Sequence, residues 1–377
     1  MRFFNGCFIF IFVLMLALPL VFVDLGSDRI SVGENRMLAN RPSFAGIKDS
    51  LGLFIRQFDE WFKDSTGFRE KLLAIYKSVN DNKWLNNVVQ YTDGHYVYLK
   101  GEKGHHYFAY TDGWMISKFQ GKKYISDEQL SGMAEKLEMV KTYLDNKNIP
   151  LVVMFCTDKE SIYPEYYPKS IKRGSEPIQL DIITNYLQEN TSVDVFNIRQ
   201  TLLSERNTNL LYVVSSGDLT HYTQIGAFFT YRELMKHINI YLPQIIPYKT
   251  EDIEISYDKK EIPNVTLKSG FTYQRLDLSF FSMVDPDLLS NGRIAGYENK
   301  NIGLPVILFF HDSYSAEYFI GKYFAQQFGK AIFIHFSHIS NIQEYINQFK
   351  PDIVVFESVE RELSGFANCV IGIPELP

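Results

Sequence analysis

Short apolar runs alternate with amphipathic stretches along most of the C-terminal three quarters of the chain. Apolar runs bounded by polar or turn residues predict strands that are buried on both faces of a sheet. Apolar positions at helical spacing predict helices between them. The expected strands are 151–156, 193–196, 210–214, 306–310, 331–336 and 353–356, and the expected helices are 126–146, 178–187, 227–238 and one from Tyr314 onward. This alternation predicts an α/β fold with a parallel sheet and flanking helices.

The strand 306–310 ends at a serine with a chemical use. His311, Asp312 and Ser313 follow the strand, and a helical pattern starts at Tyr314. Ser313 is therefore expected at the carboxyl edge of the sheet and at a helix N-terminus, where backbone N–H groups point outward. A serine in this position can attack a carbonyl carbon while neighbouring amides hold the oxyanion.

A candidate general base lies in the block from Gly217 to Ala227. Asp218 precedes His221 by three residues, and the block links the strand 210–214 to a helix from about Thr223. This spacing allows Asp218 to hold Nδ1 of the imidazole and leaves Nε2 for Ser313. The alternative is that Asp218 caps a turn and His221 only packs. Since a serine sits at a second strand end, the catalytic interpretation is favoured.

The order of several short motifs resembles one known family. They are Glu34-Asn35-Arg36-Met37-Leu38-Ala39 with Pro42, Asp64 with Phe68-Arg69, Asp112-Gly113-Trp114, Lys159-Glu160-Ser161-Ile162-Tyr163-Pro164-Glu165, Asp218 with His221, and Asp312-Ser313-Tyr314. Each motif is weak alone, but their order resembles that of the SGNH-hydrolase-like O-acetyltransferases of the alginate acetylation type (AlgX/AlgJ-like). The resemblance covers roughly residues 34–363. It implies an SGNH-like fold in which the catalytic blocks are permuted, with the Asp/His block before the serine.

The chain departs from this family in two places. Several relatives have Asp-x-His as the base block, whereas Asp218 and His221 have the spacing of ordinary SGNH esterases. Relatives usually have Gly or Arg before the Asp-Ser pair, and this chain has His311. Whether His311 contacts a substrate or packs beneath the serine turn is left open by the sequence.

The expected function is an exported O-acetyltransferase that moves an acetyl group through an acyl-serine onto hydroxyls of a cell-surface polysaccharide or exopolysaccharide. The expected catalytic residues are Ser313, His221 and Asp218. A carbohydrate esterase with the same triad and a non-catalytic polysaccharide-binding assembly protein are the alternatives. The resemblance also implies a membrane-bound acyltransferase that relays the acetyl group. Further candidates for substrate or oxyanion contacts are Tyr314, Asp312, His311, Lys159 and Tyr222.

The first residues form an apolar segment, 1–23, that predicts a signal anchor or a signal peptide. Its uninterrupted part from Cys7 to Val23 reaches only the lower end of the roughly 17–25 residues that span a bilayer. No small-residue cleavage site stands out, so an uncleaved anchor is favoured over cleavage. Either alternative exports the remainder, to the periplasm or the cell surface, with Arg2 staying inside.

Three further regions follow this segment. Residues 24–80 are expected to form a tether with membrane-proximal helices, one of them at 51–62. Residues 81–370 are expected to form the SGNH-like catalytic domain. Within it, 240–303 breaks the α/β rhythm with Pro243, Pro247 and Pro263, which predicts a β-rich insertion that shapes substrate access.

Composition narrows the function classes. The net charge of −6 argues against a nucleic-acid-binding surface. Neither a GxGxxG nor a Walker pattern is present, so no nucleotide cofactor is expected. The eight His and three Cys show no zinc-type spacing, so no metal is expected. His105 and His106 lie in a Gly-rich stretch that is interpreted as a solvated or substrate-facing loop.

Overall fold

The computed structural model describes residues 21–23, 30–31, 36–44, 51–66, 90–92, 96–110, 114–215, 218–259, 261–278, 293–299 and 303–377. The chain divides into two compact units, residues 1–94 and 95–377. The expected apolar segment 1–23 lies outside the described residues except at 21–23. The second membrane-proximal helix, expected at 68–79, also lies outside them, as do Arg69 and Asp112-Gly113. Among the described helices, none combines the length and apolar character that crossing a bilayer requires.

The described part of the first unit contains α2 (Leu51–Ser65), which confirms the helix expected at 51–62. It also contains β1 (Ile30–Ser31), β2 (Arg36–Met37) and β3 (Gln90–Thr92). Asp64, near the end of α2, is buried and accepts a hydrogen bond from the Ala39 N–H at 2.8 Å. Two residues of the family motifs are thus joined by a structural contact.

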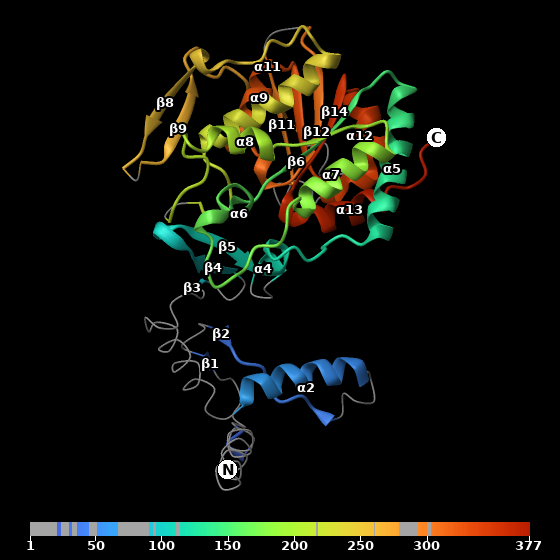
Figure 1. Cartoon of the computed structure of the whole chain (residues 1–377). Coiled ribbons are helices and arrows are strands. Elements are labelled where there is room, and N and C mark those ends of the chain that lie inside the picture. The colour runs from blue at the N-terminus through green and yellow to red at the C-terminus, as the bar shows by residue number, and fades with distance from the viewer. Residues whose placement is uncertain are drawn as a thin grey trace. The chain divides into compact units, whose positions relative to one another are not determined.

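The second unit is built on a seven-stranded mixed sheet with strand order β10-β11-β13-β12-β14-β6-β7 (Figure 1). The strands from β13 to β7 in this order are parallel, as expected, while β11 and β10 are added antiparallel at one edge. The bounds are β6 (Leu151–Cys156), β7 (Asp194–Asn197), β10 (Gln274–Arg275), β11 (Ile294–Glu298), β12 (Val306–His311), β13 (Lys330–His335) and β14 (Ile353–Val359).

Helices cover both faces of this sheet (Figure 1). On one face lie α8 (Arg199–Glu205), α9 (Gln224–Tyr241) and α11 (Lys322–Gln327). On the other lie α5 (Asp127–Asp145), α7 (Gln179–Asn190), α12 (Ile342–Phe349) and α13 (Leu363–Ile371). Successive strand residues point to opposite faces, so Ile307 and Phe309 join one core while Leu308 and Phe310 join the other. This two-sided burial explains why the strands are continuous apolar runs.

Smaller elements border the sheet. The strands β4 (Tyr96–Lys100) and β5 (His106–Tyr110) form an antiparallel pair, followed by α4 (Trp114–Phe119) and, after β6, by α6 (Lys159–Ile162). The hairpin β8 (Ile253–Tyr257) and β9 (Pro263–Leu267) lies within the stretch 240–303, as do β10 and β11. That stretch is β-rich, and its last strand belongs to the main sheet.

Three local expectations were wrong. The stretch 210–214 does not join the sheet, because Tyr212 makes only an isolated bridge to Tyr222 and Val213 and Val214 give their carbonyls to a lysine described below. His106 begins strand β5, and His105 is buried, so this segment is not a solvated loop. The helix expected from Tyr314 starts as a 3₁₀ turn, Ser313–Ser315, and a π-helical turn, Glu317–Gly321, before α11.

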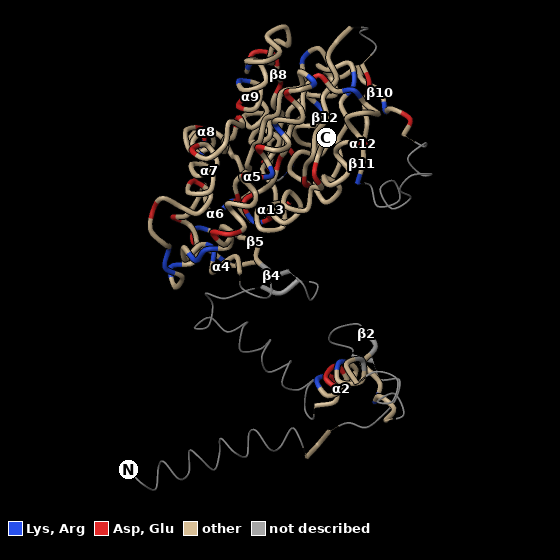
Figure 2. The backbone as a smooth tube through the Cα atoms, turned by 90° about the vertical axis from the view of Figure 1, so that its right-hand side faces the viewer, with Lys and Arg blue, Asp and Glu red and all other residues tan. Residues whose placement is uncertain are grey.

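Charged residues of both signs are distributed along the described chain. In Figure 2, Lys, Arg, Asp and Glu positions occur in most parts of the described chain, and Lys and Arg positions gather beside α4. This distribution agrees with the mild net charge of −6.

Candidate active site

Ser313, His221 and Asp218 form a hydrogen-bonded chain. The His221 Nε2 lies 2.7 Å from the Ser313 Oγ, and the His221 Nδ1 lies 2.6 Å from the Asp218 Oδ2. Ser313 follows strand β12, and His221 lies just before Thr223, whose side chain caps the N-terminus of α9. The fold therefore brings together two loops that are distant in sequence, in the geometry of a serine, a base and a carboxylate that orients the base.

The carboxylate of Asp218 is divided between its own loop and the imidazole. Its Oδ1 accepts the Thr220 N–H at 2.9 Å, the Thr220 hydroxyl at 2.6 Å and the His221 N–H at 3.2 Å. This leaves Oδ2 for the imidazole. Partial burial opposes the charged form, but the hydrogen bond and charge of His221 and the bonds from Thr220 hold the pKa of Asp218 well below its usual range. Asp218 is therefore an anion at neutral pH, as the orienting group of a triad must be.

Two tyrosines fasten the loop of the base to the loop of the serine. The Tyr222 hydroxyl donates to the Tyr314 carbonyl oxygen at 2.5 Å, and the Tyr314 hydroxyl donates to the Thr220 carbonyl oxygen at 2.6 Å. Burial raises the pKa of both phenols well above the usual value, so both remain donors. The His221 ring contacts the rings of Tyr314 and Phe319, with centroid distances of 5.0 Å and 5.1 Å.

These contacts revise the expectation for Tyr222 and Tyr314. Both side chains are buried, with exposed fractions of 2% and 0%. Their hydroxyls donate to backbone carbonyls, so they join the loops of His221 and Ser313, and neither residue lines the cleft beside Ser313. The sequence could not separate these roles, because a tyrosine beside a catalytic residue can point either way.

Asp312 shapes the turn that carries Ser313. Its Oδ1 accepts the Tyr314 N–H at 2.9 Å and its Oδ2 accepts the Val359 N–H at 2.7 Å. Its own N–H donates to the Glu357 Oε2 at 3.2 Å. Asp312 therefore ties the end of β12 to β14. The Tyr314 N–H is already bound to Asp312. Of the backbone N–H groups of Ser313 and Tyr314, that of Ser313 is therefore the better candidate for an oxyanion donor.

Lys159, expected to contact the substrate or the oxyanion, binds backbone carbonyls instead. Its Nζ donates to the carbonyl oxygens of His106 at 2.7 Å, Val213 at 2.5 Å and Val214 at 3.0 Å. The side chain is buried, and burial lowers the pKa of Lys159 to about 7. Three backbone carbonyls take up its donors, so Lys159 joins the segments around it, and it is not among the residues that line the cleft beside Ser313.

Arg361, after strand β14, contacts the loop of His221 and the loop of Ser313 and was missed by sequence reasoning. Its Nη1 donates to the Asp158 Oδ1 at 2.6 Å, to the Tyr314 hydroxyl at 3.2 Å and to the Thr220 carbonyl at 3.3 Å. The guanidinium also lies 5.1 Å from the Tyr314 ring centre. The strand before it was predicted, but the sequence gives no signal that this arginine turns inward.

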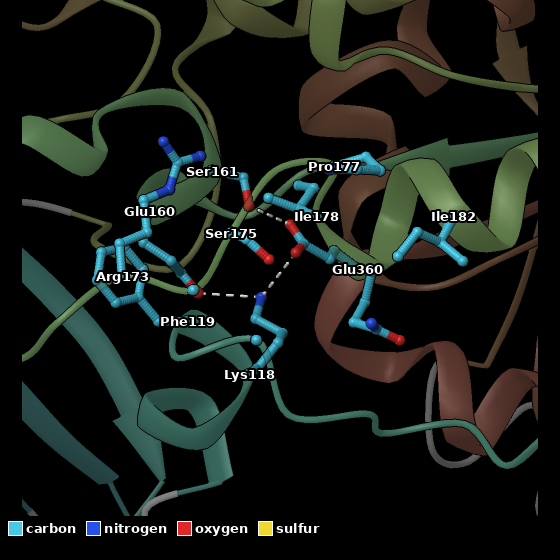
Figure 3. Close-up of a pocket in the computed structure, with 13 residues that line it drawn as sticks. Lys118, Phe119, Glu160, Ser161, Arg173, Ser175, Pro177, Ile178, Ile182 and Glu360 are labelled. Carbon is cyan, nitrogen blue, oxygen red and sulfur yellow. Dashed lines mark hydrogen bonds and ion pairs between the residues drawn. The ribbon is translucent and has the colours of Figure 1, made fainter.

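The partner of Arg361, Asp158, belongs to a buried ionic cluster. Lys118 lies 2.5 Å from Asp158, 3.0 Å from Glu160 and 3.4 Å from Glu360. Figure 3 shows the Lys118 ammonium between the carboxylates of Glu160 and Glu360, beside a cavity of about 90 Å³. Burial opposes its charge, but the three carboxylates hold the pKa of Lys118 well above its usual value. Asp158 thus connects this cluster to Arg361.

An open cleft of about 820 Å³ lies next to Ser313. Its lining includes His311, which the sequence left open, together with His335, Arg293 and Arg361. Three aromatic side chains, Tyr98, Phe108 and Phe336, also line it. A cleft of this size with apolar walls and a few polar groups is typical of a small-molecule or oligomer site. In the described part of the chain, no group of three or more His, Cys, Asp or Glu is placed to hold a metal ion.

The central part of the chain is similar to a known family. Residues 110–260 match the family model of the SGNH hydrolase-like domain of the acetyltransferase AlgX. The resemblance to this family is confirmed. The matched range contains Asp218 and His221 and ends before Ser313, so the serine rests on the structure rather than on this match. No curated protein sequence matches the chain significantly.

Solved structures support the fold. The structure of Bacillus cereus PatB1 with a sulfonyl adduct is similar with a TM-score of 0.52 and 15% identity, covering 74% of this chain and 98% of that one. A DHHW family protein from Eubacterium siraeum DSM 15702 is similar with a TM-score of 0.50 and 13% identity, covering 75% of this chain and 96% of that one. At such identities these two structures inform on the fold alone.

Proposed function

We propose that this protein is a serine-dependent O-acetyltransferase that acts on a polysaccharide. The observation that carries the proposal is the hydrogen-bonded chain from Ser313 through His221 to Asp218, with contacts of 2.7 and 2.6 Å. A non-catalytic binding protein on this fold would have no need for these three side chains to converge. The match of residues 110–260 to the AlgX acetyltransferase domain supports acetyl transfer as the reaction.

In the first half-reaction, Ser313 takes the acetyl group from a donor. His221 Nε2 accepts the Ser313 hydroxyl proton while Oγ attacks the acetyl carbonyl carbon. The tetrahedral intermediate places its oxyanion near the Ser313 N–H, which is the backbone donor assigned to it. Loss of such a donor typically costs about 100- to 1000-fold in rate. Collapse breaks the bond to the leaving group, which receives the proton from His221, and an acetyl-serine remains.

In the second half-reaction, an acceptor hydroxyl replaces the leaving group. His221 takes the proton of the acceptor hydroxyl, whose oxygen attacks the acetyl-serine carbonyl. Breaking the Ser313 ester returns the proton to Oγ and leaves the acetyl group on the acceptor. The cleft of about 820 Å³ beside Ser313 is the space that the proposal gives to this acceptor.

The setting of the reaction is part of the same proposal. The apolar segment 1–23 supports an exported protein anchored in the cell membrane, with periplasmic secretion after cleavage as the alternative. An acetyl donor supplied by a membrane-bound acyltransferase partner follows from the family resemblance. Neither the location nor this partner is needed for the chemistry at Ser313.

Acetyl transfer can be tested with the full chain and an activated ester. The protein is incubated with p-nitrophenyl acetate, with and without polysaccharide oligomers, in parallel with Ser313→Ala. Acetyl groups that appear on an oligomer and are lost in Ser313→Ala are expected. Serine-dependent acetate release that is unaffected by every oligomer would favour the esterase instead. Absence of any serine-dependent turnover would contradict both enzymatic functions.

A further inference from the structure

Two histidines sit side by side in the wall of the cleft next to Ser313. His311 ends strand β12, His335 ends strand β13, and the two residues are register partners in the parallel pairing of these strands. Register partners on neighbouring strands point to the same face and lie about 5 Å apart. Both histidines line the same cleft as Ser313.

The hydrogen-bond partner of each ring fixes which nitrogen carries the proton. The His311 Nδ1 contacts the Asp312 carbonyl oxygen, which can only accept, so Nδ1 carries the hydrogen and Nε2 is an acceptor. The His335 Nδ1 accepts the Ser337 N–H at 3.2 Å, so its Nε2 carries the hydrogen and is a donor. The two neighbouring imidazoles therefore differ at Nε2, which is an acceptor in His311 and a donor in His335.

The orientation of His335 is reinforced by a second contact. Its Nδ1 lies 2.8 Å from the Ser337 Oγ, and the Arg293 Nη1 donates to the same oxygen at 3.2 Å. Since the guanidinium can only donate, the Ser337 hydroxyl proton is directed to His335. The His335 ring also stacks on Phe336 at 4.8 Å, which supports the ring from its face.

Both rings are neutral under ordinary conditions. Burial, with a further contribution from His335, lowers the pKa of His311 to about 4. Burial and the nearby charge of Arg293 and His338 lower the pKa of His335 to about 4. A neutral acceptor beside a neutral donor matches a hydroxyl group, which donates one hydrogen bond and accepts another. It matches a carboxylate poorly, because a carboxylate cannot donate to His311.

We propose that His311 and His335 form the subsite that binds a hydroxyl group of the acceptor sugar, with Phe336 as its apolar neighbour. This inference rests on the proposed function and extends it, because it identifies the residues that favour a sugar acceptor over water. The sugar hydroxyl donates to the His311 Nε2 and accepts from the His335 Nε2–H. The two histidines are specificity-determining residues in this assignment, while proton transfer stays with His221.

The first experiment measures how the acetyl group is partitioned. The full chain is given p-nitrophenyl acetate and a panel of hexameric oligosaccharides, neutral and uronate-containing, and the ratio of acetylated sugar to free acetate is determined. His335→Phe, which keeps a ring but removes the donor, is expected to lower this ratio about tenfold, the effect of one hydrogen bond. His335→Gln, which restores an amide donor, is expected to recover most of it. His106→Gln, a histidine of β5, serves as the matched control.

The second experiment tests binding without turnover, so that a failure of the proposed function is recognised separately. Calorimetric titration of the Ser313→Ala protein with the same hexamers is repeated with His335→Phe, His335→Gln and His106→Gln added. About tenfold weaker binding in the Phe variant alone supports the subsite, even if no acetyl transfer is observed. Equal binding by the Phe variant, equal weakening by His106→Gln, or no binding of any hexamer overturns it.

Discussion

The Tyr222 hydroxyl donates to the Tyr314 carbonyl oxygen at 2.5 Å, and so joins the residue after His221 to the residue after Ser313. The Tyr314 hydroxyl completes the connection by donating to Thr220, the residue before His221. A serine and a base held on separate loops must keep their hydrogen-bond distance through the reaction. The hydrogen bonds of Tyr222 and Tyr314 link the two loops and so maintain that distance.

Tyr222→Phe is expected to lower both stability and activity. It removes a buried hydrogen bond and leaves the Tyr314 carbonyl without this donor, at a cost of about 1–3 kcal/mol. It also loosens the contact between the two loops, so Ser313-dependent p-nitrophenol release is expected to fall about tenfold or more. Urea unfolding and the initial rate of release measure the two effects.

Tyr231→Phe is the matched control for this prediction. Its hydroxyl is also buried and donates to Gln327 at 2.6 Å, but it lies on α9 and makes no contact with the triad. A similar loss of stability with unchanged turnover is expected. If both tyrosine variants lose activity equally, the loss reflects general destabilisation and the positioning role of Tyr222 is wrong.

Asp218→Asn is expected to lower turnover by about 10³- to 10⁴-fold, because an amide does not hold the imidazole in the required tautomer. The low pKa of Asp218 adds an expectation for acid conditions. The carboxylate stays ionised well below pH 5, so the wild-type rate between pH 5 and 7 does not report its protonation. Comparison of the two pH–rate profiles tests this, and an Asn variant with near wild-type turnover would exclude Asp218 from the triad.

Stability is expected to fall as the pH drops from about 6.5 towards 4. The pKa of His311 is lowered to about 4 in the folded state, whereas an unfolded histidine has a pKa near 6.5. Between these values the unfolded chain binds more protons, so the free energy of unfolding decreases with falling pH. A loss of roughly 1–3 kcal/mol is expected from this residue.

Urea unfolding at several pH values checks the histidine effect. His311→Gln removes the titrating group, so the slope of stability against pH in this window should become shallower than in the wild type. His105 and His335 also have pKa values lowered to about 4 and keep part of the slope. An unchanged slope in His311→Gln would show that this ring does not resist protonation in the folded state.

Arg361→Met is expected to destabilise the protein by about 3–5 kcal/mol, because it leaves the buried carboxylate of Asp158 with fewer partners. Turnover should fall as well, since Thr220 and Tyr314 lose a common donor. The double variant Arg361→Met with Asp158→Asn removes the unpaired charge and should regain part of the stability but not the turnover. Recovery of both in the double variant would contradict a positioning role for Arg361.

The proximity of Ser313, His221 and Asp218 could be predicted from the sequence, because each residue lies next to a strand or helix with a clear sequence pattern. Ser313 follows an apolar run that predicts a buried strand. Asp218 and His221 precede a helix, α9, whose N-terminus is capped by Thr223. The sheet was predictable from apolar runs over its parallel strands, although the run 210–214 was wrongly included in it. Its antiparallel edge was not, because β11 has a glycine and an alanine among its five residues and resembles no continuous apolar strand.

The surroundings of the triad could not be derived in the same way. Arg361 reaches Thr220 and Tyr314 only because β14 lies beside β12 in the sheet. His335 faces the cleft only because its strand pairs with β12 in one register. Lys159 illustrates the converse, since the sequence suggested it as a substrate or oxyanion contact and its side chain in fact binds three backbone carbonyls. These contacts depend on strand order and register, which local patterns do not specify.

The most direct test of the account is to identify the atom that carries the acetyl group during turnover. The full chain is mixed briefly with p-nitrophenyl acetate, quenched in acid and digested, and the peptides are examined by tandem mass spectrometry. The account predicts one acetyl group on Ser313, which disappears when an acceptor oligosaccharide is added before quenching and is absent in Ser313→Ala. Turnover that proceeds without an acetyl group on Ser313, or that persists in Ser313→Ala, would contradict it.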